Sequence, residues 1–184
     1  MQEATQKIIE AERDPVFEAF LRRQYEEGMA LADSSDLIRL CPIGWPRVQR
    51  YIAEFRCRGL VRDRDGAVRE SDFFEVGIWF PSDYLRRANP FEVLTWLGPR
   101  NVFHPNISDS FPVICVGRLD PGASLVDILY QCFEIITYNK VTMREDDALN
   151  PDACAWARMN QHRFPIDSRP LKRREIEFQI EKAG

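Results

Sequence analysis

No apolar run in this chain approaches the ~20 residues that a helix needs to cross a bilayer, so a membrane partner is not expected. The first residues, MQEATQKIIEAERD, are charged and lack the apolar core and small-residue cleavage site of a secretion signal. Only two histidines are present, and the five cysteines are widely spaced with no CxxC pair. We therefore expect a cytoplasmic protein with reduced thiols, without a metal site, a cofactor or a disulfide framework.

The chain also lacks a strongly basic region, apart from RPLKRRE near its end. Its net charge is −4 and its pI is about 5.3, because acidic residues are interspersed among the basic ones. A nucleic-acid partner is therefore not expected, since proteins that bind nucleic acids gather lysine and arginine on one face. The hydrophobic share of 45% and the charged share of 29% are typical of a soluble globular protein.

The length of 184 residues fits one domain that can bury a core without disulfides or metals. No internal repeat, low-complexity segment or linker divides the chain. We expect a single domain over residues 1–184, with a core at about 14–160 and a C-terminal extension at 161–184. The extension contains REIEFQIEK, which is compatible with a short helix, a short strand or a segment that orders on a partner.

Three segments have the pattern of helices. The first begins with Asp14 as N-cap and Pro15 at the first helical position, and it continues to about Ala32. Its apolar face is expected to consist of Val16, Phe17, Phe20, Leu21, Tyr25 and Met29. The second follows Ser124, and its expected core stripe is Leu125, Ile128, Leu129, Cys132, Ile135 and Ile136. The third follows Asn150, and Ala153, Trp156 and Ala157 are expected to face inward.

Four segments between the first two helices are rich in β-branched and aromatic residues and are bounded by turn formers. They are residues 37–45, 48–63, 71–84 and 90–99. In the second, Tyr51, Ala53, Phe55 and Cys57 alternate with Ile52, Glu54, Arg56 and Arg58, and DRDG at 63–66 predicts a hairpin turn. The element order predicts an α+β fold, in which an N-terminal helix, a four-stranded antiparallel meander and C-terminal helices form a layer sandwich.

The stretch HPNISDSFPVIC, residues 104–115, raises the question of function. Cys115 ends an apolar run and is either a buried small hydrophobe or a thiol displayed for chemistry beside His104 and Asn106. Three of the other cysteines, Cys57, Cys132 and Cys154, fit core positions. The surroundings of Cys115 therefore decide between the two interpretations.

Several motifs in this order resemble the ubiquitin-conjugating enzyme family, over about Asp14 to Met159. Phe80, Pro81 and Tyr84 in FPSDY match a corner of that family, and His104, Pro105 and Asn106 match its HPN tripeptide. Ile114 and Cys115 match the isoleucine and nucleophilic cysteine that follow, with a spacing one residue longer than the common animal pattern. The helix in DILYQCFEIITYN and the later DDALNP also match.

The resemblance implies acyl transfer between thioesters and amines. Cys115 would accept the C-terminal carbonyl of a ubiquitin-like modifier from an activating enzyme and pass it to a lysine or another acceptor. Asn106 matches the asparagine to which the family assigns an oxyanion or loop-bracing role. Asp147 matches the acidic position that orients the attacking lysine, although Asp146 and Asp147 could equally form a solvated turn. His104 and Pro105 would shape the turn.

The chain departs from the common pattern around the cysteine. The usual glycine before isoleucine-cysteine is absent, and LDPG replaces the usual tryptophan-serine-proline. After Tyr84, the residues Leu85, Arg86 and Arg87 replace the apolar ligase anchor. This divergence is similar to that of conjugating enzymes in bacterial operons linked to antiphage defence. It implies as partners a ubiquitin-like modifier, a cognate activating enzyme and a protein substrate, without a ligase of the usual kind.

Two alternative functions stay open. The chain could be an inactive variant that binds ubiquitin-like proteins, although such variants usually lose the cysteine. It could also be a cysteine hydrolase that uses Cys115 and His104, which requires the imidazole within hydrogen-bond reach of the thiol. The proline between the histidine and the asparagine disfavours that geometry.

Overall fold

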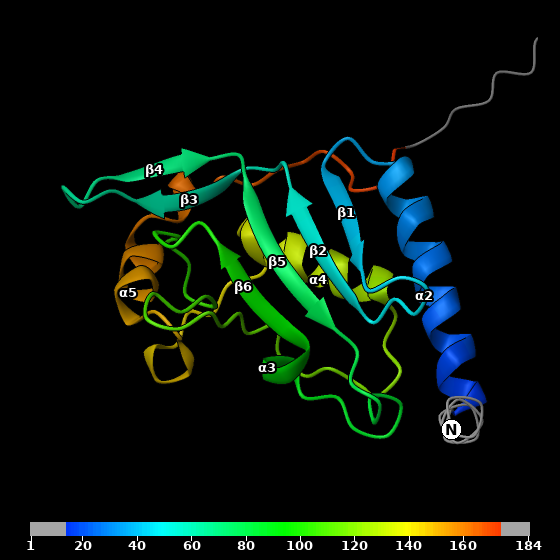
Figure 1. The fold of residues 1–184 in the computed structure, drawn as a ribbon. Helices are drawn as coiled ribbons and strands as arrows, with labels where there is room; N and C mark the ends of the chain where they lie inside the picture. The colour runs from blue at the N-terminus through cyan, green and yellow to red at the C-terminus, as the bar shows by residue number, and fades with distance from the viewer. Residues whose placement is uncertain (1–13, 174–184) are drawn as a thin grey trace, which may run out of the picture.

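The computed structural model of the chain describes residues 14–173, and Figure 1 shows their arrangement. Helix α2, Pro15–Asp33, begins as the sequence predicts, because the Asp14 carboxylate accepts hydrogen bonds from two backbone N–H groups of the first turn. A cap of this kind stabilises a helix by about 1 kcal/mol. The residues that α2 buries are Phe17, Leu21, Gln24, Gly28 and Leu31. Val16, predicted to face the core, is 66% exposed, because Phe17 occupies the first inward position.

Four strands form the antiparallel sheet predicted from the sequence, in the order β1-β2-β5-β6. They are β1 Ile38–Ile43, β2 Arg50–Phe55, β5 Phe74–Trp79 and β6 Leu94–Gly98. The alternation in β2 is confirmed, since Tyr51, Ala53 and Phe55 are fully buried and the residues between them are partly exposed. The fold is therefore α+β, with the helices before and after the sheet in the chain.

The second predicted strand, 48–63, is in fact two strands. After β2 the chain leaves the sheet and forms a separate hairpin of β3, Gly59–Arg62, and β4, Val68–Ser71. Gly59 lies so close to Phe74 that a β-carbon would stand 2.5 Å from the ring and 2.9 Å from the carbonyl oxygen of Ile136. Only glycine allows this crossing. The predicted DRDG turn does connect the two strands, with Gly66 at a φ of +85°.

The prediction of a strand from residue 90 was wrong for its first four residues. Pro90–Val93 form the short helix α3, and β6 begins only at Leu94. Asn89 explains the difference, because its side chain accepts a hydrogen bond from the Phe91 N–H at 3.1 Å and caps a turn that opens with proline. The local cap therefore outweighs the β-forming composition of the segment.

Helix α4, Leu125–Ile136, lies across one face of the sheet, and α2 lies beside β1 (Figure 1). The six residues of the apolar stripe predicted for α4 are all buried, and Phe133 is buried as well. Gln24 of α2 joins the two helices, since its buried side-chain oxygen accepts the Leu125 N–H at 2.6 Å. The Tyr84 hydroxyl donates to the Ala123 carbonyl at 2.9 Å, so the FPSDY corner also holds the start of α4.

Helix α5, Pro151–Met159, packs below the β3–β4 hairpin and has the predicted Asn150 cap. Ala153 and Ala157 are buried as expected, whereas Trp156 is only partly buried and meets the Phe103 ring edge-on. This end of the molecule has a core of its own, formed by Leu60, Phe103, Tyr138, Ala153 and Ala157. Two short 3₁₀ helices, Glu145–Asp147 and Gln161–Arg163, flank α5.

Residues 164–173 of the predicted extension have no regular secondary structure. Asp167 holds this segment in place, because its buried carboxylate accepts the Arg58 N–H at 3.2 Å and an Arg169 N–H at 2.9 Å. REIEFQIEK, for which a helix or strand was considered, lies outside the described residues. Within 14–173, no helix is long and apolar enough to span a membrane.

Candidate active site

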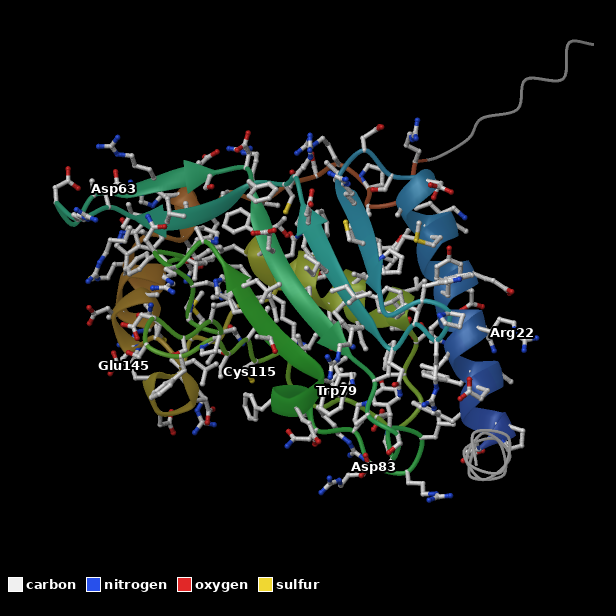
Figure 2. The ribbon with its side chains drawn as sticks, viewed as in Figure 1. Arg22, Asp63, Trp79, Asp83, Cys115 and Glu145 are labelled. Carbon is white, nitrogen blue, oxygen red and sulfur yellow. The ribbon has the colours of Figure 1, made fainter. Side chains whose placement is uncertain are left out.

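Cys115 lies on a backbone segment that pairs with the HPN turn. The Cys115 N–H donates to the Asn106 carbonyl at 2.8 Å, and Ile107 and Ile114 form an antiparallel bridge beside it. Ile107, Ile114 and Val116 are buried, whereas Cys115 itself is partly exposed. Figure 2 shows Cys115 among the loops between β6 and α5 in this view. The thiol is therefore on a rigid segment and not within the core.

Asn106 binds the cysteine segment to a loop that the sequence places far away. Its Nδ2 donates to the Cys115 carbonyl at 3.2 Å and to the Thr142 hydroxyl at 2.9 Å, and its Oδ1 accepts the Thr142 N–H at 2.8 Å. The orientation of the amide is unambiguous, because a backbone N–H can only donate. Both Nδ2 hydrogens are occupied, so the geometry is that of a brace.

His104 is buried to 1% exposure inside the same turn. Its Nδ1 accepts the Asn106 N–H at 3.0 Å, and its ring packs edge-on against Tyr138 at 4.3 Å between centroids. Burial lowers the pKa of His104 to about 3, so the ring is neutral and carries its proton on Nε2. Within residues 14–173, no hydrogen bond joins it to Cys115, which leaves a histidine–cysteine hydrolase without its general base.

The acidic turn is attached to the HPN turn through Pro105. The Pro105 carbonyl accepts the N–H groups of Leu149 and Asn150 at 2.8 and 3.2 Å. Glu145, Asp146 and Asp147 precede this contact and are exposed, and Figure 2 labels Glu145 on the α5 side of Cys115. The structure thus attaches the segment after Asp147 to the HPN turn.

Asp147 does not contact Cys115 directly. Its carboxylate lies 3.3 Å from the Arg144 guanidinium, which also pairs with Asp146 at 2.7 Å. Arg144 lowers the pKa of Asp146 through the side-chain hydrogen bond. Asp146 and Asp147 therefore already share one guanidinium, in a setting exposed to solvent.

Lys140 binds the residue that follows the cysteine. Its Nζ donates to the Val116 carbonyl at 2.6 Å, and Val116 is the residue after Cys115. Its own backbone N–H donates to the Glu134 carbonyl near the end of α4. The ammonium has three hydrogens and uses one of them here, so it is a second polar group at the cysteine segment besides Asn106.

The remaining cysteines fall into two groups. Cys57, Cys132 and Cys154 are buried as the sequence predicts, and burial raises the pKa of the Cys57 and Cys132 thiols to about 12. Cys154 donates its S–H to the Thr142 carbonyl at 3.4 Å. Cys41 is partly exposed on the sheet and is comparable to Cys115 in accessibility. The described residues contain no cluster of three or more His, Cys, Asp or Glu side chains suited to a metal.

Sequence reasoning missed Thr142 and Lys140. Thr142 is 36 residues from Asn106, and no spacing in KVTMRE marks it as a partner of the HPN turn. Lys140 immediately follows the turn that ends α4. No sequence pattern distinguishes an exposed lysine at such a position.

No protein-family model matches this chain, and a search of curated proteins finds no match either.

Proposed function

We propose that the chain is a conjugating enzyme that carries a ubiquitin-like modifier as a thioester on Cys115. The observation that carries the proposal is the position of Cys115. It is partly exposed, and the Asn106 side chain binds its segment to the HPN turn. A partly exposed thiol on a segment that an asparagine amide holds in place suits acyl transfer better than a core role.

Two steps follow from this arrangement. In loading, the Cys115 thiolate attacks the thioester carbonyl of the modifier on its activating enzyme, and the activating enzyme's thiolate leaves. In discharge, a neutral lysine amine attacks the new thioester, a carbon–nitrogen bond forms, and Cys115 leaves as a thiolate. The amine proton passes to water or to a nearby carboxylate, for which Asp147 is the candidate.

The partners that this function requires are a ubiquitin-like modifier, its activating enzyme and a protein substrate, all inside the cell. The divergence around Cys115 supports a bacterial conjugation system linked to antiphage defence as the setting. After Tyr84, Leu85 is followed by the charged Arg86 and Arg87 where the family's ligases take an apolar anchor, which supports transfer without such a ligase.

One observation favours the alternative of an inactive binding module. Both Nδ2 hydrogens of Asn106 are bound within the protein, so no asparagine donor is free for an oxyanion in this conformation. In that case the HPN turn would have a structural role only, and the chain would bind a ubiquitin-like partner without reacting with it.

Acylation by a peptide thioester separates these two functions without knowledge of the modifier. The probe is a short peptide ending in Gly-Gly as its mercaptoethanesulfonate thioester, and Cys41 is the matched thiol within the chain. We expect faster acylation of Cys115 than of Cys41, and release of the peptide to free lysine. Equal acylation of the two thiols, with no faster release to lysine than to water, would favour the binding module.

A further inference from the structure

Lys140 binds the residue that follows the proposed nucleophile. Its Nζ donates to the Val116 carbonyl at 2.6 Å, and a β-carbon on Gly117 would stand 3.6 Å from it. Standard bond lengths then limit its distance from the Cys115 sulfur to roughly 12 Å at most. The flexible four-carbon stem of lysine lets the ammonium move away from the Val116 carbonyl by changing rotamers.

Lysine is rare in this chain, which makes the position of Lys140 informative. Of the 25 basic residues only four are lysines, Lys7, Lys140, Lys172 and Lys182, and the other 21 are arginines. Arginine stays protonated and does not accept acyl groups under these conditions. The basic residues nearest in sequence to Cys115 and to the acidic turn are Arg118 and Arg144, which are both arginines. Lys140, which lies between them in the sequence, is a lysine.

Lys172 provides a contrast within the described residues. It precedes Arg173, whose N–H donates to the Ser34 carbonyl at 2.9 Å at the end of α2, so it belongs to a different part of the structure. Lys172 borders a surface hollow shared with Glu27 and Tyr130, and no residue of the cysteine segment lines it. The two lysines therefore differ in their relation to Cys115 but not in chemistry.

We propose that Lys140 is an intramolecular acceptor for the acyl group carried on Cys115, and so a self-modification site. This rests on the proposed function. The neutral Nζ attacks the thioester carbonyl, a carbon–nitrogen amide bond forms, the carbon–sulfur bond breaks, and the thiolate of Cys115 leaves while the amine proton passes to water. The product is a reductant-resistant amide next to a free thiol, and it limits further rounds when no other acceptor is present.

The test uses the full chain and the Gly-Gly peptide thioester, followed by reductant, intact mass and peptide mapping. We expect an amide-linked peptide on Lys140 that survives reductant. In K140R the Cys115 thioester still forms, but the resistant adduct falls by about tenfold or more, because the intramolecular amine is gone. K172R is the matched control and keeps the adduct at the parent level.

Two further variants decide whether the transfer is internal. In C115A the adduct on Lys140 is lost, because direct attack on the dissolved thioester is slow. When isotopically labelled C115A is mixed with the parent chain, the label stays unmodified if the transfer occurs within one chain. Modification of the labelled chain at the parent rate would overturn the proposal.

Other outcomes separate this inference from the proposed function. A Cys115 thioester that reacts with free lysine but leaves Lys140 unmodified overturns the inference alone. An undiminished resistant adduct in K140R does the same. Failure of Cys115 to acquire the peptide at all, in folded protein whose Cys41 does react, removes both the proposed function and the inference.

Discussion

Asn106 and Thr142 hold each other by two hydrogen bonds that run in opposite directions, at 2.9 Å from Nδ2 to the hydroxyl and at 2.8 Å from the Thr142 N–H to Oδ1. The third bond of the amide, to the Cys115 carbonyl, connects this pair to the candidate nucleophile. The buried side chain of Asn106 thus connects the segment after α4 to the cysteine segment.

The first prediction concerns the stability of this connection. Asn106→Ala removes three hydrogen bonds and Thr142→Val removes one, so we expect losses of roughly 2–3 and 1 kcal/mol in the free energy of unfolding. Because the two residues share a bond, the double variant should lose less than the sum of the single losses. Urea unfolding measures all three. Additive losses would show that the pair does not act as a unit.

The second prediction separates bracing from catalysis. We expect Asn106→Ala to be loaded by the peptide thioester but to discharge to free lysine about 10²–10³ times more slowly, as for loss of one oxyanion donor. Thr142→Val removes the hydroxyl that accepts one Nδ2 hydrogen of Asn106, and that hydrogen becomes available to an oxyanion. The rate of discharge from Thr142→Val should therefore equal that of the parent. Equal slowing in both variants would mean that the amide acts through bracing alone.

The third prediction concerns the thiols. Burial raises the pKa of Cys57 and Cys132 to about 12, so at pH 8 only about 10⁻⁴ of either thiol is ionised. Iodoacetamide should label Cys115 and Cys41 in the folded protein and spare these two until urea is added. Mass spectrometry of the digest reads the labelling at each position. Labelling of Cys132 at the rate of Cys115 without denaturant would contradict the burial described above.

The fourth prediction concerns His104, whose pKa is lowered to about 3 by burial. Its ring signals in NMR spectra should stay constant from pH 8 to pH 5. The chain has only two histidines, so a His162→Gln variant assigns the signals. The depressed pKa also means that stability is lost as pH falls below about 6.5, since only the unfolded state takes up the proton there. A midpoint for His104 above pH 5 would refute the prediction.

The fifth prediction concerns the extension. The side-chain hydrogen bond with Arg169 lowers the pKa of Asp167 from 3.8 to about 2. The ionised carboxylate therefore stabilises the fold by roughly 2 kcal/mol above pH 5, and this contribution disappears as pH falls through 2. Asp167→Asn should be less stable than the parent at pH 7, and the difference should shrink between pH 4 and pH 2. A difference independent of pH would exclude the ionic contribution.

Local signals in the sequence predict where the helices begin. Asp14, Ser124 and Asn150 each cap a helix as expected, because the capping oxygen and the N–H groups it accepts lie within three residues of each other. The antiparallel sheet agrees with the predicted meander, because its strands pair in the order in which they occur in the chain. The short helix α3 escaped prediction because its cap at Asn89 competes with β-forming residues, and only the structure shows which one prevails.

The candidate site is only partly predictable, for a different reason. Cys115 and Asn106 stand out because they belong to one compact motif. Thr142 and Lys140 reach that motif from the chain after α4, and their contacts depend on how α4 lies against the sheet. The DRDG turn was predicted, but the break between β2 and β3 was not, because it depends on the close passage of Gly59 over Phe74. Contacts of this range do not follow from spacing.

The backbone pairing of Asn106 with Cys115 also sets the sequence of events for any chemistry at this thiol. Ile114 and Val116 are buried in the core on either side of Cys115. The backbone at Cys115 is therefore fixed, and the sulfur cannot move between sites that lie far apart. Each donor and each acceptor has to be delivered to the same fixed point. Partners that need that point must take turns, and the departure of one becomes the condition for the arrival of the next.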